Sequence, residues 1–281
     1  GLVYIPAQEI PVVYGHDSGY EYDPAGWNTG VRFELASAPD DPETRAAFGE
    51  MVKGYISAWD PVSQTEKWRV QHSNMWNGGL LSTAGNVLFQ GNAEGEFVAY
   101  AADTGERLWS QFAQTGVVAG PVTYSVDGER YVAVAAGWGG SFALVGGELA
   151  SRSKGAVSNP RVLVYKLNAD NTLPPMPEPA QMAAITPMEP VGDEAMIIEG
   201  HRPYMASCHM CHGDRAVSGS SIPDLCKMSA DTWELFKPIV LGGLRHEQGM
   251  LGFAETLSAE DTDAIYAYLV KRRNDLAAGL D

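Results

Sequence analysis

The stretch Cys208-His209-Met210-Cys211-His212 is a C-x-x-C-H sequence, the attachment signature of a c-type haem. Two thiols held one helical turn apart can each form a thioether with a haem vinyl group, and His212 directly after them can place an imidazole nitrogen on the iron. The alternative is a partial zinc site, made of the two cysteines and two of His209, His212, Cys226 and His246. Structural zinc sites usually pair two ligand-spaced doublets, and the sequence has no second C-x-x-C and no H-x-x-x-H. The sequence therefore favours covalent haem c.

A second iron ligand has to come from another part of the chain. Met250 is the first candidate, because it lies in the short glycine-flanked segment Gly249-Met250-Leu251-Gly252 just before a capped helix, where its sulfur could approach the iron from the side opposite His212. A Met thioether raises the reduction potential relative to a second His. The other candidates are Met228, which we expect in the core, Met205 and Met210, which flank the attachment site, and His246, which would give a bis-His haem.

Residues 193–281 have helical patterns around this site. We expect a leading helix over 193–201, a helix carrying the haem sequence over 204–212, and another opening at Ser229. Ser258-Ala259-Glu260-Asp261 predicts a capping box for a last helix, whose buried stripe holds Ile265, Tyr268 and Leu269. The carbonyl of Pro223 is a candidate partner for the Nδ1 proton of His212, although an ordinary turn proline explains the residue equally well. About 90 residues of this kind predict an all-α class I cytochrome c domain.

The first part of the chain contains an internal repeat of short strands. Gly54, Ala58 and Trp68 recur at an offset of 41 residues as Gly95, Ala99 and Trp109. Further strands are predicted at 1–6, 86–91, 131–136 and 161–167. Short strands with a period of about 40 residues are typical of β-propeller blades, with a β-sandwich and a chance repeat as the alternative. Residues 1–167 then hold about four blades, so a larger ring would need additional chain to close it.

The predicted domains are 1–167 for the strands, 168–192 for a linker and 193–281 for the haem domain. The linker contains six prolines and almost no charge, which indicates a semi-rigid spacer. Within the strand domain, residues 15–50 are expected to form a long surface excursion with a turn at Pro39-Asp40-Asp41-Pro42.

Composition excludes several classes of partner. The 281 residues contain 19 Lys and Arg against 35 Asp and Glu, a net charge of −16 that argues against nucleic acid and anionic membrane surfaces. It could favour a partner with a basic docking face, although a solvated acidic surface is the more ordinary explanation. No run reaches the roughly 18 apolar residues of a membrane-spanning helix. These residues show no signal-peptide pattern, so we expect an exported protein to be represented here in mature or trimmed form. Cys226, left over from the haem sequence, is expected to be a buried small apolar residue.

Two tryptophan motifs in the strand region, Trp76-Asn77-Gly78-Gly79 and Gly137-Trp138-Gly139-Gly140, could admit a flat ligand beside an indole. The residues alone favour the structural explanation, in which the glycines form tight turns and the tryptophans pack between blades. With Gly1-Leu2-Val3-Tyr4-Ile5-Pro6, Gln114-Thr115-Gly116 and the haem sequence, however, these motifs resemble the quinohaemoprotein alcohol dehydrogenases. The repeats resemble that family's tryptophan-docking motifs, although Ser63-Gln64 departs from the usual Thr-Gly turn.

This resemblance implies a partial eight-bladed propeller that holds pyrroloquinoline quinone (PQQ) and Ca²⁺, followed by the cytochrome c domain. Trp76 and the turn at Gly139 and Gly140 match family contacts to the quinone. The family's adjacent cysteine pair, its catalytic aspartate and its calcium ligands belong to the first half of the propeller, and none can be assigned here. We therefore expect no catalytic residue in this chain, and an N-terminal propeller portion as another chain, a fragment or a region separated by a break.

The function implied is that of the C-terminal part of a periplasmic enzyme. It would oxidise alcohols to aldehydes at PQQ and pass electrons through haem c to a small soluble acceptor, such as a cupredoxin or a cytochrome. We expect the chain alone to show a low-spin c-type spectrum but no alcohol oxidation. The alternatives are a non-enzymatic electron carrier whose β domain docks a partner, and a subunit of a membrane-bound alcohol-oxidising complex.

Overall fold

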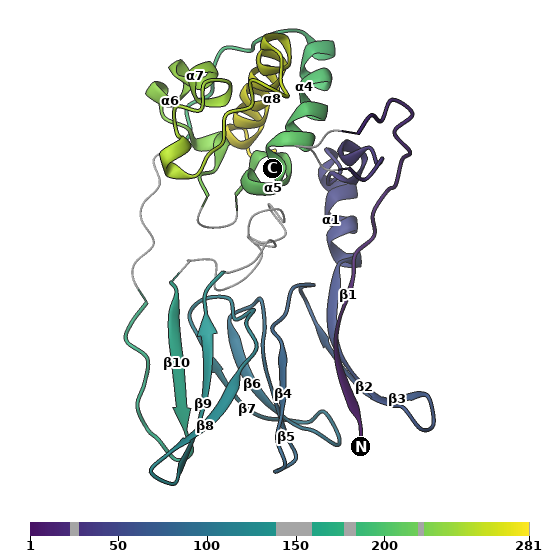
Figure 1. Cartoon of the computed structure of the whole chain (residues 1–281), viewed down its shortest axis with the longest axis vertical. Coiled ribbons are helices and arrows are strands. Elements are labelled where there is room, and N and C mark those ends of the chain that lie inside the picture. The colour runs from purple at the N-terminus through teal and green to yellow at the C-terminus, as the bar shows by residue number, and fades with distance from the viewer. Residues whose placement is uncertain (23–27, 139–158, 177–183, 219–221, 281) are drawn as a thin grey trace. The chain divides into compact units, whose positions relative to one another are not determined.

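The structure, a computed structural model, describes residues 1–22, 28–138, 159–176, 184–218 and 222–280 (Figure 1). Its internal contacts divide the chain into two compact units. Of the described residues, unit 1 holds 1–11, 46–138 and 159–176, and unit 2 holds 12–22, 28–45, 184–218 and 222–280. Among the described helices, none is both long and apolar enough to cross a membrane.

Unit 1 consists of three antiparallel sheets. The first has the order β1-β2-β3 and contains β1 (Val3–Glu9), β2 (Lys53–Asp60) and β3 (Thr65–His72). The second has the order β4-β5-β6-β7 and contains β4 (Leu80–Ser82), β5 (Val87–Gly91), β6 (Glu96–Ala101) and β7 (Arg107–Phe112). The third has the order β10-β9-β8 and contains β8 (Val122–Val126), β9 (Glu129–Ala136) and β10 (Arg161–Lys166). The strands predicted from the repeat are confirmed, whereas the short β4 and the exposed β8 were not predicted.

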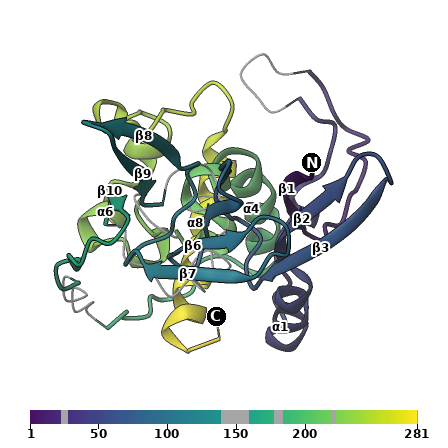
Figure 2. The same cartoon turned by 90° about the horizontal axis from the view of Figure 1, so that it is seen from below.

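The sequence repeat corresponds to two equivalent hairpins, β2-β3 and β6-β7, of which β6 and β7 run side by side in both views (Figures 1 and 2). Ala58 pairs with Trp68 in the first hairpin, and Ala99 pairs with Trp109 in the second. In both hairpins a β-bulge follows the repeated alanine. The two copies of the sequence repeat therefore have the same strand pairing and a β-bulge at the same position.

Each repeated tryptophan packs against the sheet that follows it in the chain. The Nε1 of Trp68 donates to the carbonyl oxygen of Ala102 at 3.2 Å. A Cβ at Gly105, whose φ is +76°, would lie 2.7 Å from the Trp68 ring, so only glycine fits there. Trp109 makes an edge contact with Tyr165 of the third sheet, with ring centroids 5.3 Å apart. Successive sheets are thus joined by the same residue type at the same position, as in propeller blades.

Unit 2 is helical and contains the predicted haem region. Its helices are α4 (Glu194–Ser207), α5 (His209–His212), α6 (Ala230–Glu234), α7 (Phe236–Val240) and α8 (Ala259–Ala277). Asp193 caps α4 by accepting from the Met196 amide at 2.9 Å, and the predicted capping box of Ser258 and Asp261 is formed at α8. The helix expected from Ser229 is in fact two short helices, α6 and α7, that meet at Leu235.

Residues 12–45 differ most from the sequence-based expectation. The predicted domain of 1–167 places them with the strands, but their contacts group the described residues of this segment with unit 2. The turn predicted at 39–42 leads into an unpredicted helix, α1 (Pro42–Met51). Asp41 accepts from the Thr44 amide at 2.7 Å, and Pro42 takes the first helical position. The Asp41-Pro42 pair followed by Glu43 is a helix-start signal, and the prediction of a turn at 39–42 did not take it into account.

The described ends of the predicted linker are attached to the units next to them in the chain. In unit 1, Leu173 packs on the core of the third sheet, and Gln114 Nε2 donates to the Pro174 carbonyl at 2.8 Å. In unit 2, Met188 and Asn274 exchange two hydrogen bonds, of 2.7 and 2.9 Å. The position of the boundary at 168–192 otherwise remains a prediction.

Candidate functional site

The C-x-x-C-H sequence forms a single helical turn. The amide of Cys208 donates to the Tyr204 carbonyl at 2.8 Å, which joins the turn to the end of α4. The amides of Cys211 and His212 both donate to the carbonyl of Cys208, at 3.2 and 3.0 Å. The two cysteines therefore lie on one turn, as two thioether bonds to a single haem require. The hydroxyl of Tyr204, which is fully buried, donates to the Gly213 carbonyl at 2.7 Å and fixes the exit of this turn.

The imidazole of His212 is oriented by the carbonyl of Pro223. Its Nδ1 lies 2.9 Å from the Pro223 oxygen, the contact considered from the sequence. Donation from Nδ1–H to this carbonyl leaves Nε2 with the lone pair that a metal ion would take. Burial lowers the pKa of His212, partly offset by this hydrogen bond, so the neutral ring is favoured. The ring therefore has the tautomer and charge of an iron ligand.

Three of the methionine candidates, Met205, Met228 and Met250, lie at one hydrophobic core, which we call the haem-unit core. Its twelve buried members are Tyr204, Met205, Ala216, Cys226, Trp233, Phe236, Val240, Leu257, Ile265, Tyr268, Leu269 and Val270. Met250 and Met228 are partly buried against this core, as is Cys208. Met205 belongs to the core itself, and His246 is exposed. The structure thus brings Met250 to the core shared with Cys208, and its choice over Met228 remains a prediction.

The side chains present fit a haem better than a zinc ion. No group of three or more His, Cys, Asp or Glu in the described ranges is arranged to hold a metal ion. Burial, together with the neighbouring Cys211, raises the pKa of Cys208 to about 12. In the same core, the Nε1 of Trp233 is buried and has no hydrogen-bond partner among the described residues. An unsatisfied donor of this kind suits a site that receives a ligand with polar groups.

The residues predicted at the quinone pocket are only partly described. Gly139 and Gly140 lie outside the described residues. Trp76 follows β3 and packs with its partly buried side chain on a small core of Val52, Met75, Ala93 and Trp138. The structure therefore brings the two tryptophan motifs together, although they lie far apart in the sequence.

Two glycines near these motifs have a structural explanation. A Cβ on Gly78 would lie within 2.9 Å of the carbonyl oxygens of Val117 and Ala119, so the backbones approach too closely for any side chain. A Cβ on Gly116 would lie 2.8 Å from the ring of Trp138, so this glycine makes room for the indole. The packing around Trp76 is therefore compatible with both explanations of the tryptophan motifs, the structural one and the one in which they form the wall of a flat pocket.

Two buried arginines beside the haem turn were not identified from the sequence. Arg215 follows the turn by three residues and is 3% exposed, and Arg272 of α8 is 1% exposed. A basic residue is ordinarily expected on the surface, and their partners lie far away in the sequence. The only local signal was that Asp214-Arg215 follows the attachment sequence after a single glycine, Gly213.

Two families of sequences match parts of the chain. Residues 43–132 match the family described as the β-propeller domain of glucose, ethanol and alcohol dehydrogenases. Residues 195–269 match the family described as cytochrome c oxidase, cbb3-type, subunit III. The order of propeller strands and cytochrome region predicted from the sequence is therefore confirmed.

Individual relatives match nearly the whole chain. It is 42% identical to the quinohemoprotein alcohol dehydrogenase ADH-IIG of Pseudomonas putida, over 98% of this chain and 38% of that protein. It is 40% identical to the dehydrogenase subunit of the alcohol dehydrogenase (quinone) of Gluconobacter oxydans, over 98% of this chain and 37% of that protein. The chain thus spans somewhat over a third of the length of these relatives.

Two solved structures have the same fold over this region. The ADHIIG structure from Pseudomonas putida HK5 matches 98% of this chain and 40% of its own, with a TM-score of 0.87 at 42% identity. The quinohemoprotein alcohol dehydrogenase of Comamonas testosteroni matches 100% of this chain and 40% of its own, with a TM-score of 0.75 at 34% identity.

Proposed function

Since this chain is a member of the quinohaemoprotein alcohol dehydrogenase family, matching its C-terminal propeller strands and cytochrome c domain, we propose that it belongs to a PQQ-dependent enzyme that oxidises alcohols to aldehydes. Within that enzyme, this part carries the haem c through which electrons leave. The observation that carries the proposal is the haem-attachment turn at α5, with His212 already oriented by Pro223, in the same chain as tryptophan-docked propeller sheets.

Each residue of the haem site has a distinct role in this proposal. Cys208 and Cys211 form the two thioether bonds, and their place on one turn sets the distance between them. His212 would hold the iron through Nε2, while Pro223 holds its ring in place. Met250 would be the second protein ligand, and its thioether would raise the reduction potential relative to a second His. Haem c, when bound, supplies a one-electron redox centre.

The quinone site is shared with the rest of the protein. Trp76, which packs with Met75 and Trp138, would form part of the pocket wall. The family resemblance also assigns Gly139 and Gly140 to this pocket, and these two residues lie outside the described ranges. PQQ, when bound with Ca²⁺, supplies the two-electron acceptor for the alcohol. The base that accepts the alcohol proton and the calcium ligands belong to the part of the enzyme outside this chain, so the chain alone has no alcohol dehydrogenase activity.

The surroundings proposed for the enzyme are the bacterial periplasm, where a small soluble acceptor such as a cupredoxin or a cytochrome takes the electrons. Support for such a partner comes from charge, because 35 acidic against 19 basic residues favour a basic docking face on the acceptor.

The test uses the full-length protein, loaded with PQQ and Ca²⁺. Adding ethanol or 1-butanol should reduce the haem in single-turnover experiments, whereas the chain of 281 residues alone should show a c-type spectrum and no reduction by alcohol. Met250→Ala should lower the haem reduction potential, within the range of about 0.8 V that axial ligands span, and Met228→Ala should leave it unchanged. Turnover by the chain alone, or a potential that responds only to Met228, would contradict the assignment.

A second candidate is the dehydrogenase subunit of a larger quinone-linked complex. It is supported by the 40% identity to the Gluconobacter oxydans subunit, nearly the same as that to ADH-IIG. An activity of the native protein that depends on detergent and on copurifying subunits would favour this candidate over a soluble enzyme. A non-enzymatic carrier has less support, since the relatives named above are dehydrogenases.

A further inference from the structure

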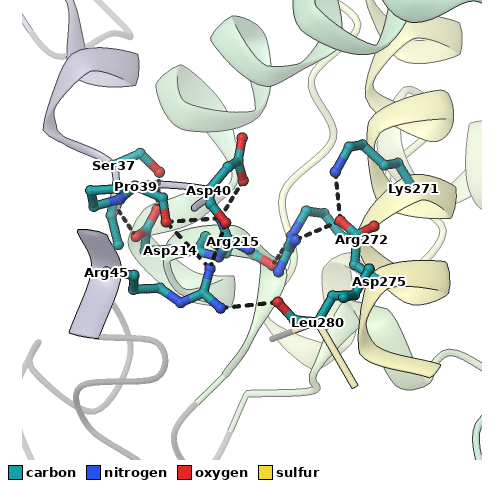
Figure 3. A network of polar contacts seen from close by, with 11 residues as sticks. Ser37, Pro39, Asp40, Arg45, Asp214, Arg215, Lys271, Arg272, Asp275 and Leu280 are labelled. Atoms are coloured by element: carbon teal, nitrogen blue, oxygen red, sulfur yellow. Dashed lines mark hydrogen bonds and ion pairs between the residues drawn. The ribbon is translucent and has the colours of Figure 1, made fainter. Parts of the chain in front are cut away.

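The segment between β1 and β2 makes a polar network with the haem unit (Figure 3). The segment starts from one strand of unit 1 and returns to the next, but its described residues group with unit 2. Residues 37–45, which we call the latch segment, contact two places: the residues directly after the haem turn and the end of the chain after α8.

The first contact is to Asp214 and Arg215, which follow the haem-attachment turn after Gly213. The carboxylate of Asp214 accepts from the Ser37 hydroxyl and, at 2.8 Å, from the Ala38 amide. The guanidinium of Arg215, with a side chain only 4% exposed, forms an ion pair with Asp40, whose side chain is 81% exposed. A buried guanidinium needs such a partner, because an unpaired buried charge is strongly unfavourable.

The backbone at this contact is strained. Arg215 and Ala216 both have positive φ angles, +57° and +63°, although neither is glycine. Such conformations persist only where the surrounding contacts hold them. The carbonyl of Arg215 accepts from Arg272 Nε at 3.1 Å, and its side chain is held by Asp40. The contact from the latch segment is therefore one of those that fix the backbone at Arg215 and Ala216.

The second contact is at the C-terminal end. Arg45 donates through Nη2 to the Leu280 carbonyl at 3.0 Å and through Nη1 to the Asp40 carbonyl at 3.1 Å. Arg45 therefore joins the latch segment to the residues after α8 and closes the loop that presents Asp40. Near the start of the same excursion, Asp17 forms a further ion pair with Arg202 of α4 at 3.0 Å.

We propose that residues 37–45 are a noncovalent latch that holds the haem unit on a segment of the propeller chain, so that Asp40 and Arg45 are positioning residues for the haem. Connectivity supports this assignment. The segment is covalently continuous with β1 and β2, and its contacts with Asp214, Arg215 and Leu280 are to the 193–281 region. The proline-rich linker is then one of two attachments of the haem unit. The consequence for electron transfer rests on the proposed function, whereas the latch itself does not.

The direct test is to cut the linker in the complete holoenzyme. A protease site inserted between residues 176 and 184 allows cleavage after folding, and size-exclusion chromatography then measures release of the haem-bearing piece. Cleaved wild type should keep the piece. Asp40→Asn combined with Arg45→Ala should release it about thirtyfold faster or more, since it removes the ion-pair partner that Asp40 gives to the buried Arg215 guanidinium, and loss of such a partner acts on the dissociation rate.

The matched control is Asp263→Asn, which breaks an ion pair with Lys237 on the same unit where both side chains are about half exposed, 48% and 50%. It should release the piece at the wild-type rate, and Asp40→Glu, which keeps the charge, should behave as wild type. Release of the piece from cleaved wild type, or equal retention in the Asp40→Asn, Arg45→Ala variant, would overturn the latch.

A second readout separates the latch from the proposed function. In the uncleaved variant we expect an unchanged haem spectrum and reduction potential, but alcohol-driven haem reduction at least about threefold slower, because haem placement is less uniform. If wild type shows no alcohol-driven haem reduction, the proposed function fails while the retention assay still decides the latch. A shifted potential in the variant would instead mean that the haem site itself was damaged, and would overturn a positioning role.

Discussion

Unit 1 repeats one contact between successive sheets, whereas unit 2 depends on contacts that each occur once. In unit 1, Trp68 and Trp109 perform the same packing at equivalent positions. In unit 2, the attachment turn, the oriented His212, and the contacts of the buried Arg215 and Arg272 each occur once among the described residues. A repeated apolar contact tolerates the loss of one copy, because its neighbours remain. A buried charge or a ligand site that occurs once has no neighbour that could compensate for its loss. The two units should therefore respond differently to substitution.

The largest difference is expected from the haem attachment. Replacing both Cys208 and Cys211 by Ala should abolish covalent haem completely and remove the cooperative unfolding transition of unit 2, because its core loses the ligand around which it packs. The transition of unit 1 should stay in place. Haem staining after denaturing electrophoresis and calorimetry check both parts. Retention of a sharp unit 2 transition would show that this unit folds without its haem.

The next effect concerns the buried arginine of α8. Arg272→Leu removes the donor to the Arg215 carbonyl, at 3.1 Å, and the partner of Asp275, at 2.9 Å. Because breaking a buried pair costs about 3–5 kcal/mol, and Lys271 still pairs with Asp275, we expect unit 2 to lose about 3 kcal/mol. Lys237→Ala, at an exposed pair, should cost no more than about 1 kcal/mol. Equal losses by denaturant titration would mean that burial of the charge is unimportant here.

A smaller effect of opposite sign is expected at the repeated turns of unit 1. Gln64 has a φ of +53° at the position where the second repeat has Gly105. A non-glycine residue in this region costs roughly 1–2 kcal/mol, so Gln64→Gly should stabilise unit 1 by about 1 kcal/mol. Gly105→Gln should destabilise it by more, because its Cβ would also overlap the Trp68 ring at 2.7 Å. Thermal unfolding of the matched pair decides this, and a neutral Gln64→Gly would show that the turn carries no strain.

The smallest effect is a difference in pH dependence. Burial lowers the pKa of His72 in unit 1, where its Nε2 lies 2.9 Å from Gln90 Oε1. As the pH falls, the unfolded chain therefore takes up the proton before the folded chain does. The contribution of His72 to the free energy of unfolding is fully present above about pH 6.5 and falls by at most about 1.4 kcal/mol per pH unit below that pH. His72→Gln should remove this slope in the unit 1 transition.

The latch carboxylate serves as the control in unit 2. Burial acts to raise the pKa of Asp40, but Arg215 outweighs it and the net pKa is lowered. Its contribution is therefore present above about pH 4 and is lost only as the pH falls through the lower pKa of the folded state. Asp40→Asn should leave the slope between pH 6.5 and 5 unchanged. A variant that alters this slope would place the titrating group elsewhere.

Local patterns were sufficient for much of the fold. The haem-attachment turn, the capping box at Ser258 and the equivalent hairpins follow from residues close together in the sequence. Spacing within one turn or one hairpin is set by backbone geometry, so it can be read directly from the order of residues. The short strand β4 and the division of one expected helix into α6 and α7 were not predicted, because a few residues give too little periodicity to detect.

The sequence by itself determined the order of parts: propeller strands, a proline-rich linker and a haem unit with Cys208, Cys211 and His212. Only the tertiary structure decided that the described residues of 12–45, between two propeller strands, belong with the haem unit, and that Arg215 and Arg272 are buried. The reason is physical. A charged side chain looks like a surface residue until its partner is known, and the Asp40–Arg215 pair joins residues 175 positions apart. No local rule predicts which of many acidic residues will meet a given arginine, because that choice is made by the packing of the whole unit.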